Sequence, residues 1–249
     1  MKQLLKNTIY KYCKNLHSKI KDQWFYDCLS QFKSLDKEHR FLIKEEEFWK
    51  CLNDNTTNSG FDTQYEYHQA WAARILSQTN PKKHTNISSR ISFNAIVSAF
   101  IPIEFYDFRP AKIYLENLEC KKADLTDLYF EENSIQSLSC MHAVEHIGLG
   151  RYGDEIDPNG DLKAINELKR VLSKGGDLLF VVPVGKPRIQ YNAHRIYSYE
   201  MILDYFKEFE LKDYTLIPDN ALEIGLIKNA TKEITDKQKY ACGCFWFRK

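Results

Sequence analysis

The feature that most constrains the fold is an amphipathic helix followed closely by a buried strand. Residues 161–172 (DLKAINELKRVL) have the apolar spacing of one helical face, with apolar side chains at 162, 165, 168, 171 and 172. We expect Asp161 to cap this helix and the stretch 174–176 (KGG) to end it. Residues 177–182 (DLLFVV) form a continuous apolar run, which predicts a strand buried on both faces. Such a strand requires helices on both sides of its sheet.

Helical and extended patterns alternate along most of the chain. Further helices are predicted at 67–76, 91–100 and 198–206, and further strands at 101–106, 134–140, 211–217 and 240–247. This alternation predicts an α/β fold with a Rossmann-like, doubly wound, mostly parallel sheet that helices cover on both faces.

A run of turn-forming residues marks the best domain boundary. Residues 53–60 (NDNTTNSG) contain no apolar side chain. Before them, residues 1–52 alternate basic, aromatic and aliphatic residues at helical spacing, which predicts two or three amphipathic helices. We therefore divide the chain into a helical N-terminal extension, 1–60, and one α/β domain, 61–249. The extension could cover a pocket of the larger domain or form a homodimer contact.

Charge and cysteine content exclude several classes of function. The 35 Lys and Arg residues nearly balance the 34 Asp and Glu residues, so no basic field predicts nucleic-acid binding. Lys and Asn interrupt every apolar run near the N-terminus, and no stretch is long enough to predict a membrane span. We expect a cytoplasmic protein whose seven cysteines are free thiols. The spacing of Cys242 and Cys244 suits neither a redox turn nor a zinc knuckle.

Several motifs occur in a characteristic order along the predicted domain. Asp107 follows the strand at 101–106, the segment ADLTDL spans 123–128, and VEH occupies 144–146. The run RVLSKGG then leads into the strand LLFVVP. This order, over residues 67–247, resembles that of class I S-adenosylmethionine-dependent methyltransferases. The resemblance implies S-adenosyl-L-methionine as the cofactor.

The resemblance also implies roles for the residues that follow the strands. Asp107 would bind the ribose hydroxyls, because a carboxylate can accept two hydrogen bonds from a diol. Asp124 and Leu125 would lie along the adenine, and Met141 and His142 would face the methyl group. All of these residues follow predicted strands, so they should meet at the edge where open α/β sheets bind ligands.

A more specific resemblance is carried by three runs in the second half of the chain. The runs SCMHAVEHIGLGRYGD, VVPVGKPRIQYNAHRIYS and CGCFWF resemble a family of uncharacterised methyltransferase-like proteins, known only as a domain of unknown function. Members of such families are often found with bacterial surface-polysaccharide enzymes. The resemblance therefore implies a small polar acceptor, such as a sugar or sugar nucleotide, in capsule or O-antigen biosynthesis.

The chain departs from the methyltransferase pattern at the turn after the first strand. Methyltransferases usually have a glycine-rich turn there, whereas this chain has Asn86, Ile87, Ser88 and Ser89. The loss of glycine matters if the turn needs positive φ. We expect Asn86 and Ser88 to contact the cofactor through a shifted backbone. The alternatives are a catalytically degenerate binding or scaffolding protein and a nucleotide-sugar-binding transferase on the same fold.

The sequence His142-Ala-Val-Glu145-His146 matches the H-x-x-E-H pattern of one class of zinc peptidases. That chemistry needs a helix, but a strand runs into His142 and glycines follow His146, so we predict no metal site. We expect His146 to act as a general base with Glu145 on the substrate side, and His194 is a second candidate base. The alternative for His146 is a purely structural histidine.

Two further segments are candidates for acceptor binding. The loop 148–160 is long, rich in glycine and charged, which is typical of a functional loop, and its candidate binding residues are Arg151, Tyr152 and Asp154. The segment after the strand 177–182 would form a local cationic group suited to a phosphate, nucleotide sugar or carboxylate. Its candidate residues are Lys186, Arg188, Asn192 and Arg195. The alternatives are a solvated connection for the loop and surface ion pairs for the basic segment.

Overall fold

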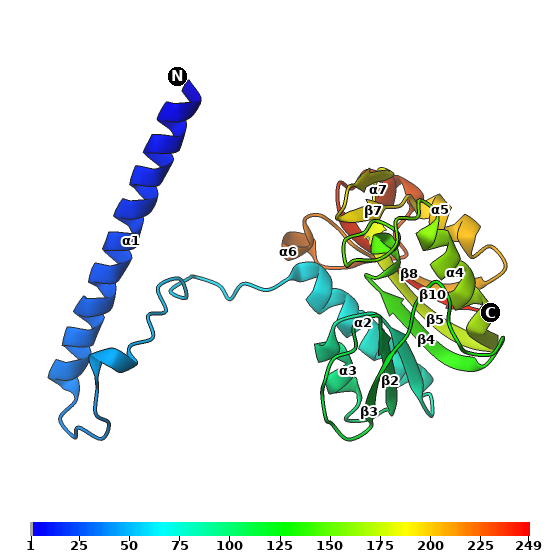
Figure 1. Cartoon of the computed structure of the whole chain (residues 1–249), viewed down its shortest axis with the longest axis horizontal. Coiled ribbons are helices and arrows are strands. Elements are labelled where there is room, and N and C mark those ends of the chain that lie inside the picture. Colours follow the sequence, from blue (N-terminus) through cyan, green and yellow to red (C-terminus); the bar gives the residue numbers. More distant parts are fainter. Residues whose placement is uncertain (1) are drawn as a thin grey trace. The chain divides into compact units, whose positions relative to one another are not determined.

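The computed structural model describes the backbone of residues 2–249 and the side chains of residues 19–249. The chain divides into two units, Met1–Gly60 and Phe61–Lys249, and each is described by itself (Figure 1). Within the described residues, no helix combines the length and the apolar character needed to cross a lipid bilayer.

The first unit contains one long helix, α1 (Lys2–Leu35), and a short 3-10 helix, η1 (Glu45–Glu47). The separate amphipathic helices predicted for residues 1–52 form one continuous helix over residues 2–35, because no glycine or proline lies there to end it, and a short 3-10 helix follows. The segment after η1 returns to α1. There the Lys50 ammonium lies 2.9 Å from the Asp22 carboxylate and 4.6 Å from the centre of the Tyr26 ring.

The second unit is a sheet with helices on both faces (Figure 1). Its helical segments are α2 (Thr63–Thr79), α3 (Ile91–Val97), η2 (Val144–His146), α4 (Gly160–Val171), α5 (Tyr199–Tyr205), α6 (Ala221–Ile224) and α7 (Lys232–Asp236). Its strands are β1 (His84–Ile87), β2 (Ile103–Asp107), β3 (Leu118–Lys122), β4 (Ile135–Met141), β5 (Leu172–Val184), β6 (Arg188–Gln190), β7 (His194–Ile196), β8 (Glu210–Ile217), β9 (Ile227–Lys228) and β10 (Ala241–Arg248).

The sheet has eight strands in the order β3-β2-β1-β4-β5-β10-β8-β9. The five strands from β3 to β5 in this order are parallel to one another. Strand β10 is antiparallel to both β5 and β8, and β9 is antiparallel to β8. Strands β6 and β7 form a separate hairpin. The predicted α/β fold with a mostly parallel, Rossmann-like sheet is confirmed.

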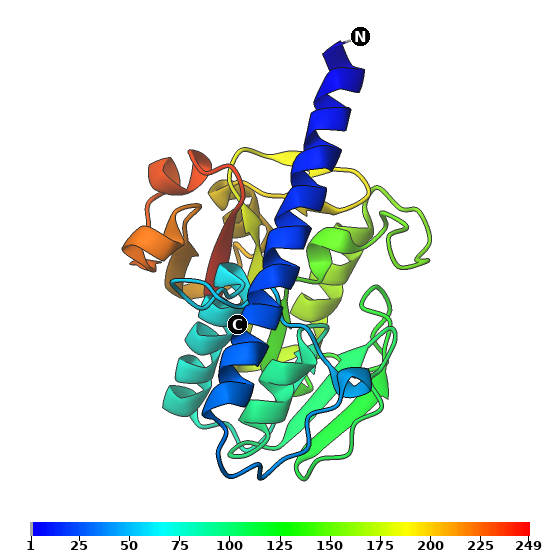
Figure 2. The ribbon, with the colours of Figure 1, turned by 90° about the vertical axis from the view of Figure 1, so that its left-hand side faces the viewer.

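Strand β5 shows how the sheet is covered on both faces. Leu178 and Phe180 belong to a core that includes apolar side chains of α4 and α5, whereas Leu179 and Val181 belong to a core with α2 and α3. Alternate residues of a strand point to opposite faces, so each face of β5 contributes to a different core. Figure 2 shows α2 and α3 together on the near face of the sheet.

The connection around α4 differs from the prediction in two ways. The residue before the helix is Asn159, and the carboxylate of Asp161 accepts a hydrogen bond from the Tyr197 hydroxyl at 2.9 Å, so Asp161 is not a cap. The helix ends at Val171 and β5 begins at once, so the KGG stretch belongs to the strand. Gly175 has φ of +72° there and donates its N–H to the Lys249 carbonyl.

Strands β1 and β3 and the β6–β7 hairpin were not predicted from the sequence. Strand β1 has only four residues (HTNI), and its last two, Asn86 and Ile87, belong to the predicted turn. Strand β3 (LECKK) lies at one edge of the sheet and has a single fully buried side chain. Short or polar strands of this kind lack the alternating apolar signal on which prediction depends.

Candidate functional site

A cavity of about 530 Å³ opens where the neighbouring strands β3, β2, β1 and β4 end. This is the edge at which open α/β sheets bind their ligands. Nine of the residues singled out from the sequence line it: Ser88, Asp107, Asp124, Leu125, Met141, His142, His146, Tyr152 and Asp154. The other eight do not: Asn86, Glu145, Arg151, Lys186, Arg188, Asn192, His194 and Arg195.

Two carboxylates lie at the cavity, each at the end of a strand. Asp107 ends β2, and its Oδ1 accepts the N–H of Arg109 at 2.8 Å. Asp124 follows β3, and its Oδ1 accepts the N–H and the hydroxyl of Thr126 at 2.8 and 2.7 Å. These local bonds orient both side chains, and within the described residues each carboxylate has its second oxygen available to a ligand. Leu125, next to Asp124, is buried in the cavity wall.

The turn after β1 is built from serine and asparagine. Ser88 has a φ of +50°, and its N–H donates to the Tyr106 carbonyl at 2.7 Å. The Ser89 hydroxyl accepts from the side-chain amides of Asn86 and Asn94 at 2.9 and 3.4 Å. Asn86 was expected to contact a ligand, but its side chain is fully buried and does not line the cavity. It instead stabilises the turn through its hydrogen bond to Ser89.

The left-handed conformation of Ser88 leads to a stability prediction. In this conformation, steric contact of the Cβ atom destabilises a residue by about 1–2 kcal/mol. Glycine has no Cβ, but it destabilises the folded state by about 0.5–1 kcal/mol because it loses more conformational entropy on folding. We expect Ser88→Gly to raise the free energy of unfolding by about 0.5–1 kcal/mol in urea denaturation. Ser89→Gly is the matched control and should be destabilising, because it removes the hydroxyl that both amides use. If Ser88→Gly lowers the free energy of unfolding, the left-handed backbone of Ser88 does not destabilise the folded protein and the prediction is wrong.

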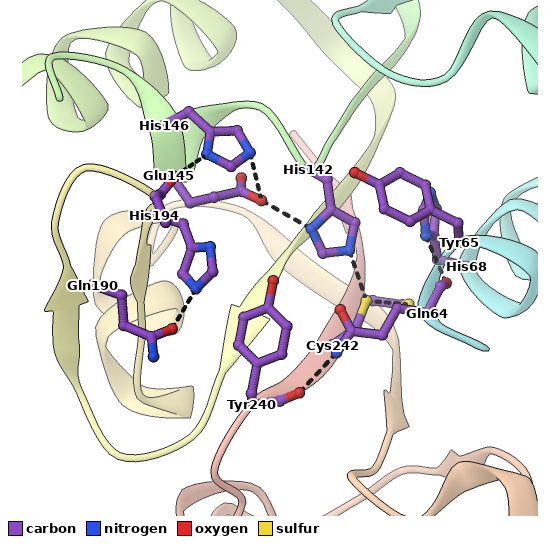
Figure 3. Close-up of polar contacts among 12 residues, drawn as sticks. Gln64, Tyr65, His68, His142, Glu145, His146, Gln190, His194, Tyr240 and Cys242 are labelled. Carbon is purple, nitrogen blue, oxygen red and sulfur yellow. Dashed lines mark hydrogen bonds and ion pairs between the residues drawn. The ribbon is translucent and has the colours of Figure 1, made fainter. Parts of the chain in front are cut away.

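A buried chain of hydrogen bonds follows β4 (Figure 3). The Glu145 carboxylate accepts from Nδ1 of His142 at 2.8 Å and lies 3.7 Å from Nε2 of His146. Nε2 of His142 lies 3.3 Å from the sulfur of Cys242. Nδ1 of His146 donates to the Ala193 carbonyl at 2.6 Å, which leaves its Nε2 as a hydrogen-bond acceptor.

Burial and neighbouring charges shift the pKa values of His142 and Glu145 in opposite directions. Burial alone would lower the pKa of His142, but the Cys242 sulfur and the Glu145 carboxylate raise it overall. Burial would raise the pKa of Glu145, but its hydrogen bond and attraction to His142 lower it. Glu145 is fully buried, so its place differs from the predicted one on the substrate side: it orients His142 instead.

The second candidate base, His194, also lies away from the cavity. Its Nε2 is 2.6 Å from the side-chain oxygen of Gln190, and its ring stacks on Tyr240 with centroids 4.7 Å apart. Burial lowers the pKa of His194. His146 is therefore the one of the two predicted bases that faces the cavity in the part of the chain that the structure describes.

The loop between η2 and α4 closes on itself around Asp154. The carboxylate of Asp154 accepts the N–H groups of Gly148, Gly150 and Tyr152 at 2.8–3.2 Å. Burial would raise the pKa of Asp154, but these backbone groups lower it. A Cβ at Gly148 would lie 2.0 Å from the Asp157 carbonyl oxygen, so only glycine fits there. Asp154 therefore organises the loop and also lines the cavity.

The predicted cationic group does not form. Arg195 is buried, and its guanidinium donates to the carbonyls of Ile147 and Pro158 at 2.6 and 3.2 Å. Lys186, Arg188 and Asn192 are exposed outside the cavity, and Arg188 donates to backbone carbonyls. The guanidinium of Arg151 donates to the Ala193 carbonyl, so it also supports the loop.

Two arginines at the cavity were missed in the sequence. The Arg90 guanidinium lies over the Tyr65 ring at 4.2 Å from its centre, and the Arg109 guanidinium lies over the Tyr152 ring at 4.5 Å. Arg109 comes just after the predicted strand 101–106, so position after a strand was the signal that could have found it, whereas Arg90 follows β1, which was not predicted. Tyr65 was missed because the predicted helix began at residue 67, whereas α2 begins four residues earlier, at Thr63.

Solved structures share the fold of the second unit. The YcgJ protein of Bacillus subtilis is 14% identical with a TM-score of 0.50, over 74% of this chain and 98% of that one. A Burkholderia thailandensis 1,6-didemethyltoxoflavin-N1-methyltransferase, solved with bound 1,6-didemethyltoxoflavin and S-adenosylhomocysteine, is 12% identical with a TM-score of 0.52, over 74% of this chain and 79% of that one. The [4+2]-cyclase SpnF is 13% identical with a TM-score of 0.51, over 78% and 85%. No curated protein sequence matches the chain.

The second unit has the fold of class I S-adenosylmethionine-dependent methyltransferases. The chain belongs to the family DUF268, described as a Caenorhabditis protein of unknown function, whose model matches residues 118–242, half of the chain. Neither this description nor the names of the similar structures connects the chain with surface polysaccharides. Because one similar structure is a cyclase, the fold alone does not determine the reaction.

Proposed function

We propose that the cavity binds S-adenosyl-L-methionine and that the protein transfers its methyl group to a small polar acceptor. The observation that carries this proposal is the Asp107 carboxylate, which ends β2 at the wall of a cavity of about 530 Å³. Small-molecule sites usually have volumes of about 300–1,000 Å³. Of the two oxygens of this carboxylate, one is held by the Arg109 N–H, and the other can accept a ribose hydroxyl.

The remaining cofactor contacts follow from the order of the strand ends. Asp124 and the buried Leu125 would take the adenine, with a polar acceptor beside an apolar surface. Ser88, at the end of β1, would face the methionine part, where its left-handed backbone gives the approach that glycine usually provides. Met141 and His142, after β4, would lie near the methyl group.

His146 is the proposed base for a hydroxyl or amine acceptor. Its Nδ1–H is held by the Ala193 carbonyl, so Nε2 can take a proton as the acceptor attacks the methyl carbon. Methyl transfer is an in-line displacement, and most of its acceleration comes from holding the acceptor in place. Tyr152, whose ring packs edge-on against His146 at 5.7 Å, is the proposed acceptor contact. A sugar or sugar nucleotide is the acceptor class that we propose to test first.

Calorimetric titration with S-adenosylmethionine and S-adenosylhomocysteine tests the cofactor proposal. Removing charge-assisted hydrogen bonds to the ribose costs about 1.5–3 kcal/mol, so Asp107→Ala should weaken binding roughly 10- to 100-fold. Glu116→Ala is the matched control, because Glu116 is exposed and does not line the cavity. It should bind both compounds as the wild type does. Wild-type protein that binds neither compound would contradict the proposal.

A second candidate function is a methyltransferase-fold protein that binds partners without catalysis. The observation that favours it is the turn after β1, where Asn86 is buried below Ser88 and Ser89 and offers the cavity no side chain. A protein of this kind would show no saturable heat with either compound at any concentration tested. The titration of the wild type therefore separates the two candidates.

A further inference from the structure

Three metal-ligating side chains from distant parts of the sequence meet behind the cavity wall (Figure 3). They are His68 on α2, His142 after β4 and Cys242 at the start of β10. One ligand atom of each lies within 4.8 Å of the others, and Nε2 of His142 is 3.3 Å from the Cys242 sulfur. His68 and Cys242 are fully buried, and the His142 side chain is 4% exposed.

The hydrogen bonds of both histidines occupy Nδ1 and leave Nε2 as the ring nitrogen that can bind a metal ion. Nδ1 of His68 donates to the Gln64 carbonyl at 2.8 Å, and Nδ1 of His142 donates to the Glu145 carboxylate at 2.8 Å. In the neutral rings that metal binding requires, each Nε2 carries a lone pair. Nε2 of His68 is buried and has no hydrogen-bond partner in the described part of the chain. A buried nitrogen of this kind is costly unless something binds it.

We propose that His68 Nε2, His142 Nε2 and Cys242 Sγ bind a zinc ion. Two imidazoles and a thiolate are ligands that Zn²⁺ prefers, at about 2.0–2.1 Å for nitrogen and 2.3 Å for sulfur. Tetrahedral geometry at these lengths places ligand atoms roughly 3.3–3.6 Å apart. The separation of 3.3 Å between His142 Nε2 and Cys242 Sγ already matches, and no other separation in the cluster exceeds 4.8 Å, so His68 needs to move by at most about 1.5 Å.

The surroundings have the features of a metal site beyond its ligands. A carboxylate and a backbone carbonyl hold the two imidazoles by Nδ1, which fixes their orientation as in known zinc sites. The two negative charges of the Cys242 thiolate and the Glu145 carboxylate balance the two positive charges of Zn²⁺, so the net buried charge of these groups is zero. Binding releases the thiol proton of Cys242 to solvent. Cys244, whose buried sulfur is 4.0 Å from that of Cys242, is the candidate for the fourth ligand; its coordination as a thiolate would release a second proton and bring the buried charge to −1.

The position of the site indicates a structural role. It joins α2 to β4 and β10 at the edge of the sheet that carries the cavity, and His142 belongs to both. The Tyr65 ring, which lines the cavity, lies close to His142 with ring centroids 5.2 Å apart, on the cavity side of the proposed ligands. The zinc proposal does not depend on the proposed methyltransferase function.

Elemental analysis and metal titration of the full chain test this proposal. The chain stripped with a chelator and titrated with zinc chloride should bind one equivalent. Cobalt chloride in its place should produce the visible bands of a tetrahedral site and a sulfur-to-cobalt charge-transfer band in the near ultraviolet. Thermal unfolding of the stripped protein should shift upward when zinc is restored, since the ion binds the folded state preferentially.

Two ligand variants and one support variant sharpen the test. Cys242→Ser should lose the charge-transfer band, and His68→Gln should weaken zinc binding at least 100-fold. Glu145→Gln, which keeps a hydrogen bond to His142, should weaken it about 10- to 100-fold. Cys120→Ser and His39→Gln are controls outside the cluster and should bind zinc as the wild type does. Circular dichroism checks that each variant is folded. Failure of the wild type to bind zinc, or equal binding by the folded ligand variants, would overturn the proposal.

Discussion

Replacing Arg195 by methionine lowers the free energy of unfolding by about 3–5 kcal/mol, because it leaves a buried carboxylate without its cation. Arg195 is buried on β7, and its Nε lies 3.5 Å from the Asp161 carboxylate. The guanidinium also holds the carbonyls of Ile147 and Pro158, at the two ends of the loop that precedes α4. Methionine has a similar length and provides none of these bonds. Urea denaturation followed by circular dichroism measures the loss.

Two further variants separate the ion pair from the general effect of losing an arginine. Arg188→Met changes the same residue type on the neighbouring strand β6, where the side chain is exposed, and should cost less than about 1 kcal/mol. The double variant Arg195→Met/Asp161→Asn should lose less than the sum of its two single variants, because it leaves no unpaired charge. An Arg195→Met protein as stable as the wild type would contradict the structural role of this arginine.

The sheet could be predicted because its central parts carry strong local signals. The amphipathic pattern of α4 (Gly160–Val171) and the apolar run of β5 predicted a parallel sheet that helices cover on both faces. The polar ends of these elements carried no such signal. Gly175 was interpreted as the end of the helix, but its left-handed turn lies inside β5, where the last residue of the chain accepts its N–H. That contact is between residues far apart in sequence.

The candidate site was predictable where strand ends determine it. Asp107, Asp124 and His142 line the cavity because the ends of neighbouring parallel strands meet at one edge. Arg195 lies on β7, and its burial depends on how the loop 148–160 folds over it, which no local sequence pattern shows. The proposed zinc site also could not be predicted from a local pattern. The H-x-x-E-H run supplies His142 alone, and the other two ligands come from α2 and β10.

His84 provides a second large and measurable effect, which appears in acid. His84 begins β1 and is fully buried, with its ring nitrogens 2.7 and 2.8 Å from the hydroxyls of Ser137 and Ser139 on β4. Burial lowers the pKa of His84 from 6.5 to about 3 in the folded protein. Between these two values, the unfolded chain binds a proton that the folded protein does not. Stability is therefore fully present above the unfolded pKa and declines as the pH falls toward 3.

The expected size follows from proton linkage. Each pH unit below 6.5 costs about 1.4 kcal/mol, so this one histidine removes about 2.7 kcal/mol of stability at about pH 4.5. The side chain of His84→Gln cannot take up a proton. Between neutral pH and about pH 4.5, its free energy of unfolding should therefore fall by about 2.7 kcal/mol less than that of the wild type. His39→Gln, at a position whose side chain is 79% exposed, is the control and should follow the wild type. Urea denaturation at several pH values measures all three proteins. Parallel curves for His84→Gln and the wild type would show that His84 takes up its proton without unfolding.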